Sequence, residues 1–170
     1  MLPLDLARLS REGSLRIQAD MDPEDPLWEG SEVRLKGPLH VDLRANETQS
    51  GEIVVRGTLK GTLAQECRRC LDPVETPLDE EVTLVFAPPD LLAGVEDGET
   101  RVLPVEDTEV DLAEPIREEV ILAAPAFVVC DPDCKGLCPH CGVDLNETTC
   151  DCAVSEPDPR WDALRALKKE

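Results

Sequence analysis

The chain has 170 residues, 41% of them hydrophobic but only 2% aromatic, and its net charge is −20 at pH 7. This length suits one domain with an aliphatic core plus a small appendage. No apolar run is long enough to span a bilayer, and the segment from Met1 to Arg11 has no apolar export signal, so we expect a cytoplasmic protein without a membrane partner. The acidity argues against general binding of polyanions, because affinity for phosphates comes from lysine and arginine.

The negative charge is concentrated in the middle of the chain. Residues 72–119 carry 16 acids and 2 bases, whereas residues 1–71 have a net charge of −2 and residues 130–170 a net charge of −4. The charge at either end of the chain is therefore low enough to allow contact with nucleic acid, whereas the acidic residues 72–119 should attract a basic partner.

The first elements in chain order are strands. Alternating Leu15, Ile17 and Ala19 predict a half-buried strand, and the two prolines within residues 22–30 predict a loop. Residues 32–44 and 53–63 then alternate apolar and polar side chains on either side of a turn at residues 46–51. This pattern predicts a long antiparallel hairpin with one solvated face, and Pro38 predicts a bulge or an edge position in its first strand.

The solvated face of this hairpin gathers basic side chains. Its bases are Arg34, Lys36, Arg44, Arg56 and Lys60, and Arg68 and Arg69 follow where the second strand ends. Two interpretations stay open: an ordinary solvated face, or a contact surface for RNA or an acidic protein. On the second interpretation the candidate contacts are Arg34, Lys36, Arg56, Lys60, Arg68 and Arg69.

A further strand and a helix are predicted after the hairpin. Val82, Leu84 and Phe86 alternate as in a strand, residues 87–101 form a loop, and a short strand is expected near residues 101–105. Helical spacing of apolar residues over 111–124 predicts a helix that packs on the sheet and stops at Pro125. Its start is either a capping box of Asp111 and Glu114 or a first helical residue at Pro115.

The last segment predicts a short terminal helix. Asp158 and Pro159 suit a helix start, and Trp161, Leu164 and Leu167 form an apolar stripe. We therefore expect an α+β fold with an antiparallel β-rich sheet or partial barrel and one packed helix, followed by a cysteine-rich zinc module. The predicted division is a β-rich domain at 1–129 and, at 130–170, the module with the terminal helix packed on it.

Eight cysteines carry the strongest chemical signal. They fall in close pairs, and two thiolates two residues apart can bind one side of a tetrahedral Zn²⁺, so we predict two structural zinc ions. The candidate ligands are Cys67, Cys70, Cys130, Cys134, Cys138, Cys141, Cys150 and Cys152. Two assignments of the cysteines to sites are open. In one, the first four cysteines form one site and the last four form the other. In the other, the four cysteines within residues 130–141 form one site, and the pair at 67 and 70 forms the second site with the pair at 150 and 152.

Other uses of these thiols are open at this stage. A disulfide framework would need an oxidising compartment. A redox pair at Cys67 and Cys70, or a thiol-based sensor, would need a lowered thiolate pKa, which Arg68 and Arg69 would favour, but no thioredoxin-like βαβ pattern surrounds them.

Catalysis finds little support in the sequence. Only His40 and His140 are available as histidine acid–base groups, and neither a phosphate-cradling glycine loop nor a nucleophile elbow occurs. We therefore expect neither an enzyme nor a small-molecule substrate.

Four segments together resemble the YceD-like family. They are E-C-R-R-C-L-D-P-V, D-L-A-E-P-I-R-E-E-V-I-L-A-A-P, C-D-P-D-C-K-G-L-C-P-H-C-G-V-D-L-N and D-P-R-W-D-A-L, and the resemblance covers most of residues 30–168. Members of that family are called large ribosomal RNA subunit accumulation proteins. The resemblance implies a bacterial or plastid factor in ribosome biogenesis that supports accumulation or processing of large-subunit ribosomal RNA, without a known catalytic residue. Given the charge, a ribosomal protein or an rRNA-processing factor is a more natural partner than naked RNA, although large-subunit rRNA stays possible.

Overall fold

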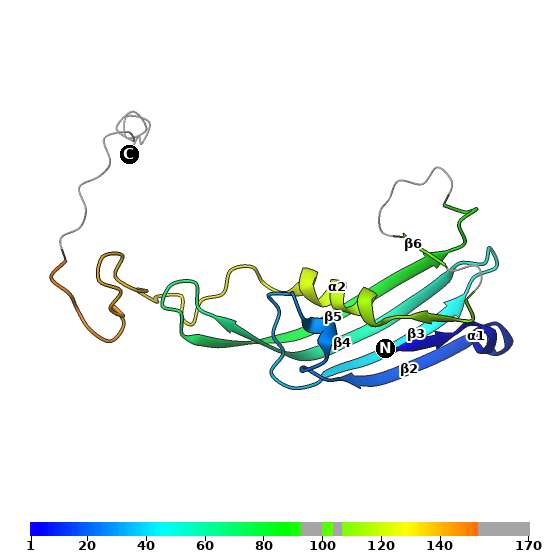
Figure 1. Cartoon of the computed structure of the whole chain (residues 1–170), viewed down its shortest axis with the longest axis horizontal. Coiled ribbons are helices and arrows are strands. Elements are labelled where there is room, and N and C mark those ends of the chain that lie inside the picture. The colour runs from blue at the N-terminus through cyan, green and yellow to red at the C-terminus, as the bar shows by residue number, and fades with distance from the viewer. Residues whose placement is uncertain (93–99, 104–106, 153–170) are drawn as a thin grey trace, which may run out of the picture.

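A mainly antiparallel sheet forms the body of the molecule (Figure 1). The computed structural model describes residues 1–92, 100–103 and 107–152. The elements in chain order are β1 (Pro3–Asp5), α1 (Leu6–Glu12), β2 (Ser14–Met21), the 3-10 helix η1 (Pro26–Trp28), β3 (Leu39–Glu47), β4 (Ile53–Glu66), β5 (Pro73–Ala87), β6 (Thr100–Val102), β7 (Glu109–Asp111) and α2 (Ala113–Ala123). The five-stranded sheet has the order β2-β3-β4-β5-β6, with only β5–β6 parallel, and β1 pairs with β7 separately. The predicted α+β class with a β-rich sheet is confirmed.

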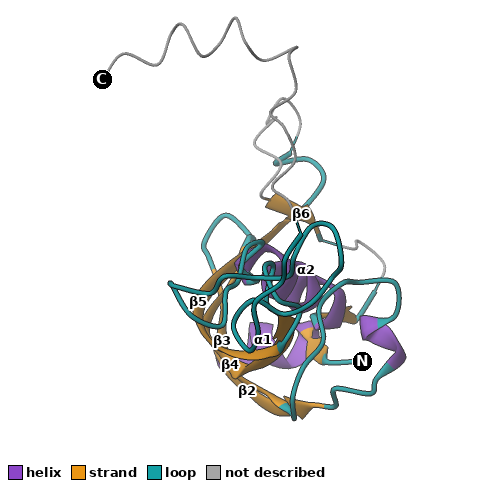
Figure 2. Cartoon of the chain, turned by 90° about the vertical axis from the view of Figure 1, so that its left-hand side faces the viewer, coloured by secondary structure: helices purple, strands orange, loops and turns teal. Residues whose placement is uncertain are grey.

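The sheet is strongly curved, and α2 packs on its concave inner face, as Figure 2 shows. Among the described strands β6 does not pair back to β2, so the curl stays open. The inner face is aliphatic, and Ile116 and Val120 of α2 are fully buried against it. Trp28 and Phe86 are the aromatic side chains of this core, which agrees with the scarcity of aromatic residues in the sequence.

The β3–β4 hairpin has the predicted dry and solvated faces. Leu43 pairs with Gly57 toward the core, and Arg44 pairs with Arg56 on the outer face. The strand that was predicted to begin near Val33 starts only at Leu39. The reason is the local backbone, since Gly37 has a φ of 115° and Pro38 follows, and a single bridge from Leu35 to Leu63 continues the pairing beyond them.

The start of α2 differs from both predicted starts. The helix begins at Ala113, its N-cap is Leu112, and no side chain caps it. Asp111 instead accepts hydrogen bonds from the N–H of Ala113 at 3.0 Å and from the N–H of Leu2 at 2.6 Å. The carboxylate therefore joins the N-terminal segment to the helix entrance. The predicted stop before Pro125 is confirmed.

Three features of the fold were not predicted. The short helix α1 has Asp5 as its N-cap, which accepts from the N–H of Arg8 at 2.7 Å, and Gly13 as its left-handed C-cap. The β1–β7 pair involves three residues on each side. Strand β5 begins at Pro73, well before the alternation at Val82, and pairs with β4 over residues 73–86.

Two predictions concern the end of the chain. The terminal helix and its apolar stripe lie outside the described residues, and the division into 1–129 and 130–170 stays a prediction. No helix in the described ranges is both long and apolar enough to cross a membrane.

Gly57 pairs with Leu43 of β3 and leaves no room for a Cβ, and we predict that Gly57→Ala is destabilising. A Cβ at this position would collide with the backbone carbonyl oxygen of Asp42 and lie 2.8 Å from the Cα of Leu43. Because backbone rather than a flexible side chain must move, we expect a loss of about 2 kcal/mol in the free energy of unfolding. Thr58→Ala, one position further on the outer side of β4, is the control and should cost much less. Equal urea midpoints for both variants would contradict the prediction.

Candidate metal centre

The eight cysteines form two groups of four in space. The first cluster is Cys67, Cys70, Cys130 and Cys134, and the second cluster is Cys138, Cys141, Cys150 and Cys152. Within each cluster the sulfur atoms lie within 4.8 Å of one another. The structure therefore shows the assignment in which the first four cysteines form one group and the last four form the other. The alternative assignment is wrong, because the turn between β4 and β5 places Cys67 and Cys70 beside the loop that follows α2.

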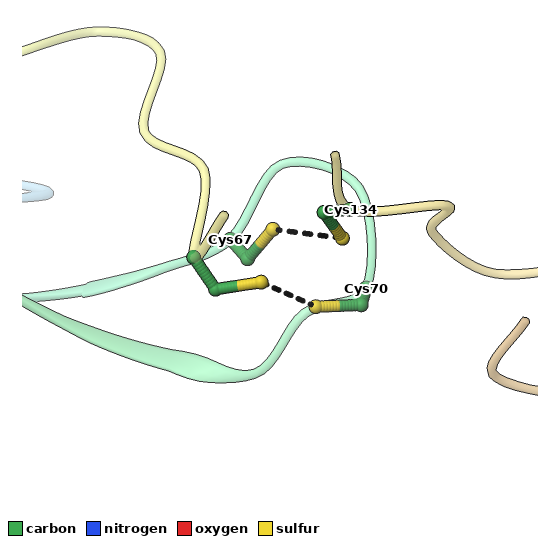
Figure 3. A group of neighbouring side chains, drawn as sticks. Cys67, Cys70 and Cys134 are labelled. Atoms are coloured by element: carbon green, nitrogen blue, oxygen red, sulfur yellow. Dashed lines mark hydrogen bonds between the residues drawn. The ribbon is translucent and has the colours of Figure 1, made fainter. Parts of the chain in front are cut away.

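Distances within the first cluster suit a tetrahedral ion. The Sγ atoms of Cys67 and Cys134 are 3.8 Å apart and those of Cys70 and Cys130 are 3.5 Å apart. Figure 3 shows the side chains of Cys67, Cys70 and Cys134 gathered at the turn. A zinc–sulfur bond of about 2.3 Å implies about 3.8 Å between two sulfurs of one tetrahedron. A disulfide would bring two sulfurs to about 2.05 Å. The donors therefore fit a soft dication.

The first cluster is organised by a tight turn at the end of β4. The N–H of Arg69 donates to Cys67 Sγ at 3.4 Å, and the N–H of Leu71 donates to the carbonyl oxygen of Cys67 at 2.9 Å. Leu71 has a φ of 67°, a left-handed conformation that is unusual for leucine. The turn thus directs both sulfurs of the C-R-R-C pair to the same side.

The same turn recurs in the second cluster. The N–H of His140 donates to Cys138 Sγ at 3.5 Å, and the N–H of Gly142 donates to the carbonyl oxygen of Cys138 at 2.9 Å. Gly142 has a φ of 73°, so glycine occupies here the position that Leu71 occupies in the first turn. The backbone of His140 shapes the turn, while its side chain is not among the four ligand groups of this cluster.

In each cluster one thiol has a lowered pKa and two thiols have a raised pKa. Burial opposes ionisation of Cys67, but backbone N–H groups, led by that of Cys70, bring its pKa to about 6. Backbone N–H groups of Cys141 and His140 likewise lower the pKa of Cys138 to about 6. The neighbouring thiol of Cys141 raises the pKa of Cys152 to about 12. Without a cation, the four thiols with a raised pKa therefore keep their protons at neutral pH, and a bound dication would release them.

Two polar side chains support the cysteine clusters, Asn146, which sequence reasoning missed, and Arg69, which it named only as a possible partner contact. Asn146 donates from Nδ2 to Cys134 Sγ at 3.4 Å, and its Oδ1 accepts from the N–H of Lys135 at 2.8 Å. Arg69 donates to the carbonyl oxygens of Pro132 at 3.0 Å and of Cys134 at 2.8 Å. The only sequence signal for Asn146 was its place in the V-D-L-N segment after the second cysteine turn.

The predicted basic contact residues do not form one surface. Lys36 is paired with Glu75, and Lys60 with Asp79 at 3.0 Å, both on the outer face of the sheet. Arg56 lies on the same face opposite Arg44, without an ion-pair partner among the described residues. Arg69 is engaged in the first cluster, and Arg34 and Arg68 line a groove at the free edge of β4. The RNA or partner role of these six residues stays a prediction.

Comparison with known proteins identifies related sequences. Residues 55–168 match the family described as large ribosomal RNA subunit accumulation protein YceD. An uncharacterised protein of Mycobacterium tuberculosis is 35% identical over 173 residues, covering 96% of this chain and 79% of that protein. A chloroplastic protein of Zea mays named large ribosomal RNA subunit accumulation protein YCED homolog 1 is 27% identical over 177 residues, covering 88% of this chain and 60% of that protein. YlbN of Bacillus subtilis is 27% identical over 143 residues, covering 82% of this chain and 80% of that protein. No solved structure matches the chain.

We predict that Cys138→Ser destabilises the C-terminal segment more than His140→Ala does. The serine removes one thiolate donor from the second cluster and with it metal-derived folding energy, whereas the imidazole can be removed while the His140 backbone bond to sulfur stays. Thermal unfolding of the two variants, each with zinc present, provides the comparison. Equal loss of stability would show that the imidazole is a ligand and that the donor set is different.

Proposed function

Because the chain belongs to the YceD family of large ribosomal RNA subunit accumulation proteins, we propose that it is a non-enzymatic accessory factor in ribosome biogenesis. In this role it supports accumulation or processing of large-subunit ribosomal RNA in the cytoplasm of a bacterium. The observation that carries the proposal is the family match over residues 55–168, which spans both cysteine clusters, β4 and β5, and α2.

We further propose that each cluster holds one structural zinc ion. Thiolate is a soft donor that suits zinc, and four sulfurs within 4.8 Å of one another are enough to complete a tetrahedral coordination shell. A complete shell leaves no coordination position for a reacting water, so the ions would stabilise the fold of residues 130–152 rather than take part in a reaction. This supports the proposal of an accessory factor over that of a metal-dependent hydrolase.

A basic protein is the partner that the charge distribution favours. Asp79, Glu80 and Glu81 are consecutive exposed acids on β5, and of these only Asp79 has an ion-pair partner within the described residues. The edge of β5 that faces away from β4 pairs with no described strand over residues 73–84, since β6 pairs only with residues 85–87 of β5. Such a surface repels phosphates and accelerates encounter with a basic ribosomal protein or processing factor.

Zinc content tests the metal proposal. We expect about two zinc ions per chain in protein purified without chelator, measured by elemental analysis. Thiols bound to metal have a lowered pKa in the folded state, so the stability they contribute is present at neutral pH and is lost as the pH falls. We therefore expect zinc release and a falling melting temperature on acidification or chelation. Metal-free protein with eight rapidly reacting thiols would favour a thiol sensor instead.

Salt-dependent binding tests the partner proposal. We expect purified basic large-subunit ribosomal proteins to bind more tightly than large-subunit rRNA fragments, and Glu80→Lys with Glu81→Lys to slow protein association by at least about tenfold. Glu24→Lys with Glu29→Lys, exposed acids before β3, is the matched control. Tight rRNA binding that weakens steeply with salt, and is lost when Arg34, Lys36, Arg56 and Lys60 are replaced, would contradict the proposal.

A further inference from the structure

A groove of about 860 Å³ runs along the edge of β4 beside the first cluster. It lies between the segment at residues 30–34 and the segment at residues 121–128, which leaves α2 toward the cysteines. We propose that this β4-edge groove binds an extended, acidic peptide segment of a partner protein, which adds to β4 as a short strand. The inference is independent of the ribosomal role and of the nature of the metal.

The backbone of β4 provides the docking edge. Ala64 donates its N–H to the carbonyl oxygen of Arg34 at 2.8 Å, and Arg68 donates its N–H to the carbonyl oxygen of Val128 at 2.9 Å. Because backbone groups alternate along a strand, the carbonyl of Ala64 and the N–H of Glu66 point to this same edge. No described strand pairs with them there, since β3 leaves β4 at Lys60 and the last bridge is at Leu63. The carbonyl of Ala64 and the N–H of Glu66 thus interrupt the backbone hydrogen-bond ladder along this edge, and in our proposal one extended peptide segment pairs with them.

Side chains around the gap suit a peptide with apolar residues. The groove has apolar walls, contributed by Val33, Leu63, Ile121, Ala124 and Val128. Two residues that line the groove also contain buried polar atoms that form no hydrogen bond within the described part of the chain, namely Gln65 Oε1 and Arg117 Nε. Both atoms are covered by the protein and do not face a ligand directly, so the fit of the groove to a peptide rests on its apolar walls and on the free backbone groups of β4.

Charge and composition separate a peptide from a nucleic acid as the occupant. Three arginines and two glutamates line the groove, a net charge of +1 within a chain of charge −20. Arg117 is paired with Glu114 at 3.6 Å, whereas Arg34 and Arg68 have no ion-pair partner among the described residues. The positive lining favours an acidic segment over a basic one. No aromatic side chain lines the groove, whereas single-stranded RNA is typically bound by stacking its bases on aromatic rings.

Binding of short probe peptides to the full chain tests the inference. The probe is an acetylated, amidated Val-Asp-Val-Asp-Val peptide, and the readout is the backbone amide NMR spectrum. We expect the largest shifts at residues 64–68 and 121–128. The matching Val-Lys-Val-Lys-Val peptide and a probe with N-methylated backbone amides should each bind about tenfold more weakly. Shifts confined to the outer face, or equal binding of the acidic and basic probes, would overturn the proposal.

A pair of neighbouring substitutions on α2 provides the matched control. Ile121 is 36% exposed and lines the groove, whereas Leu122 is 79% exposed and does not. We expect Ile121→Asp to weaken acidic-probe binding about tenfold and Leu122→Asp to leave it unchanged. Equal effects of the two would overturn the proposal, as would an oligouridine probe that binds this groove more tightly than the acidic peptide. Shift mapping on the unmodified chain decides the outcome even where a variant does not fold.

Discussion

The approach of four sulfur atoms at the end of the β4–β5 hairpin is the contact on which the C-terminal part of the described chain depends. Between Pro125 and Cys152 the only buried residues are Cys134, Gly136 and Cys138. The cluster around Cys67 has only half-buried Val74, Val129 and Leu137 as apolar neighbours. A segment with so little apolar surface to bury cannot fold by hydrophobic burial alone, and on the metal proposal metal–ligand bonds would take the place of a core.

The parts of the fold that the sequence predicted are those whose signal is local and repeated. Alternation over β3 and β4 and the apolar spacing of Ile116 and Val120 each recur over several residues, and the cysteine pairs are defined by spacing alone. The helix α1 and the β1–β7 pair were missed because they are too short to show a repeating pattern of apolar residues. Asp5 and Gly13 are nevertheless recognisable as the caps of α1. Asn146 is a partner of Cys134 only through the folded path of the chain.

The roles of the basic residues were beyond sequence reasoning for a different reason. Whether Lys36 and Lys60 are free depends on which strand lies beside β4 and in which register. Strand β5 places Glu75 and Asp79 within reach of them, so the two lysines of the stripe form ion pairs, Arg44 and Arg56 lie opposite each other, and Arg34 lines the groove. Exposed ion pairs of this kind contribute little stability, about 0–1 kcal/mol, but they remove positive charge from a surface that would otherwise attract phosphates.

The two clusters are unequal in what they organise. The first closes a loop of 60 residues between Cys70 and Cys130, whereas the second closes a loop only within residues 138–152. In terms of chain entropy alone, closing the longer loop removes more freedom from the unfolded chain, by about 1 kcal/mol. The first cluster also holds Val128 beside Arg68, where their backbone bond ends the free edge of β4. Disrupting the first cluster should therefore loosen one wall of the β4-edge groove, whereas disrupting the second should leave that wall in place.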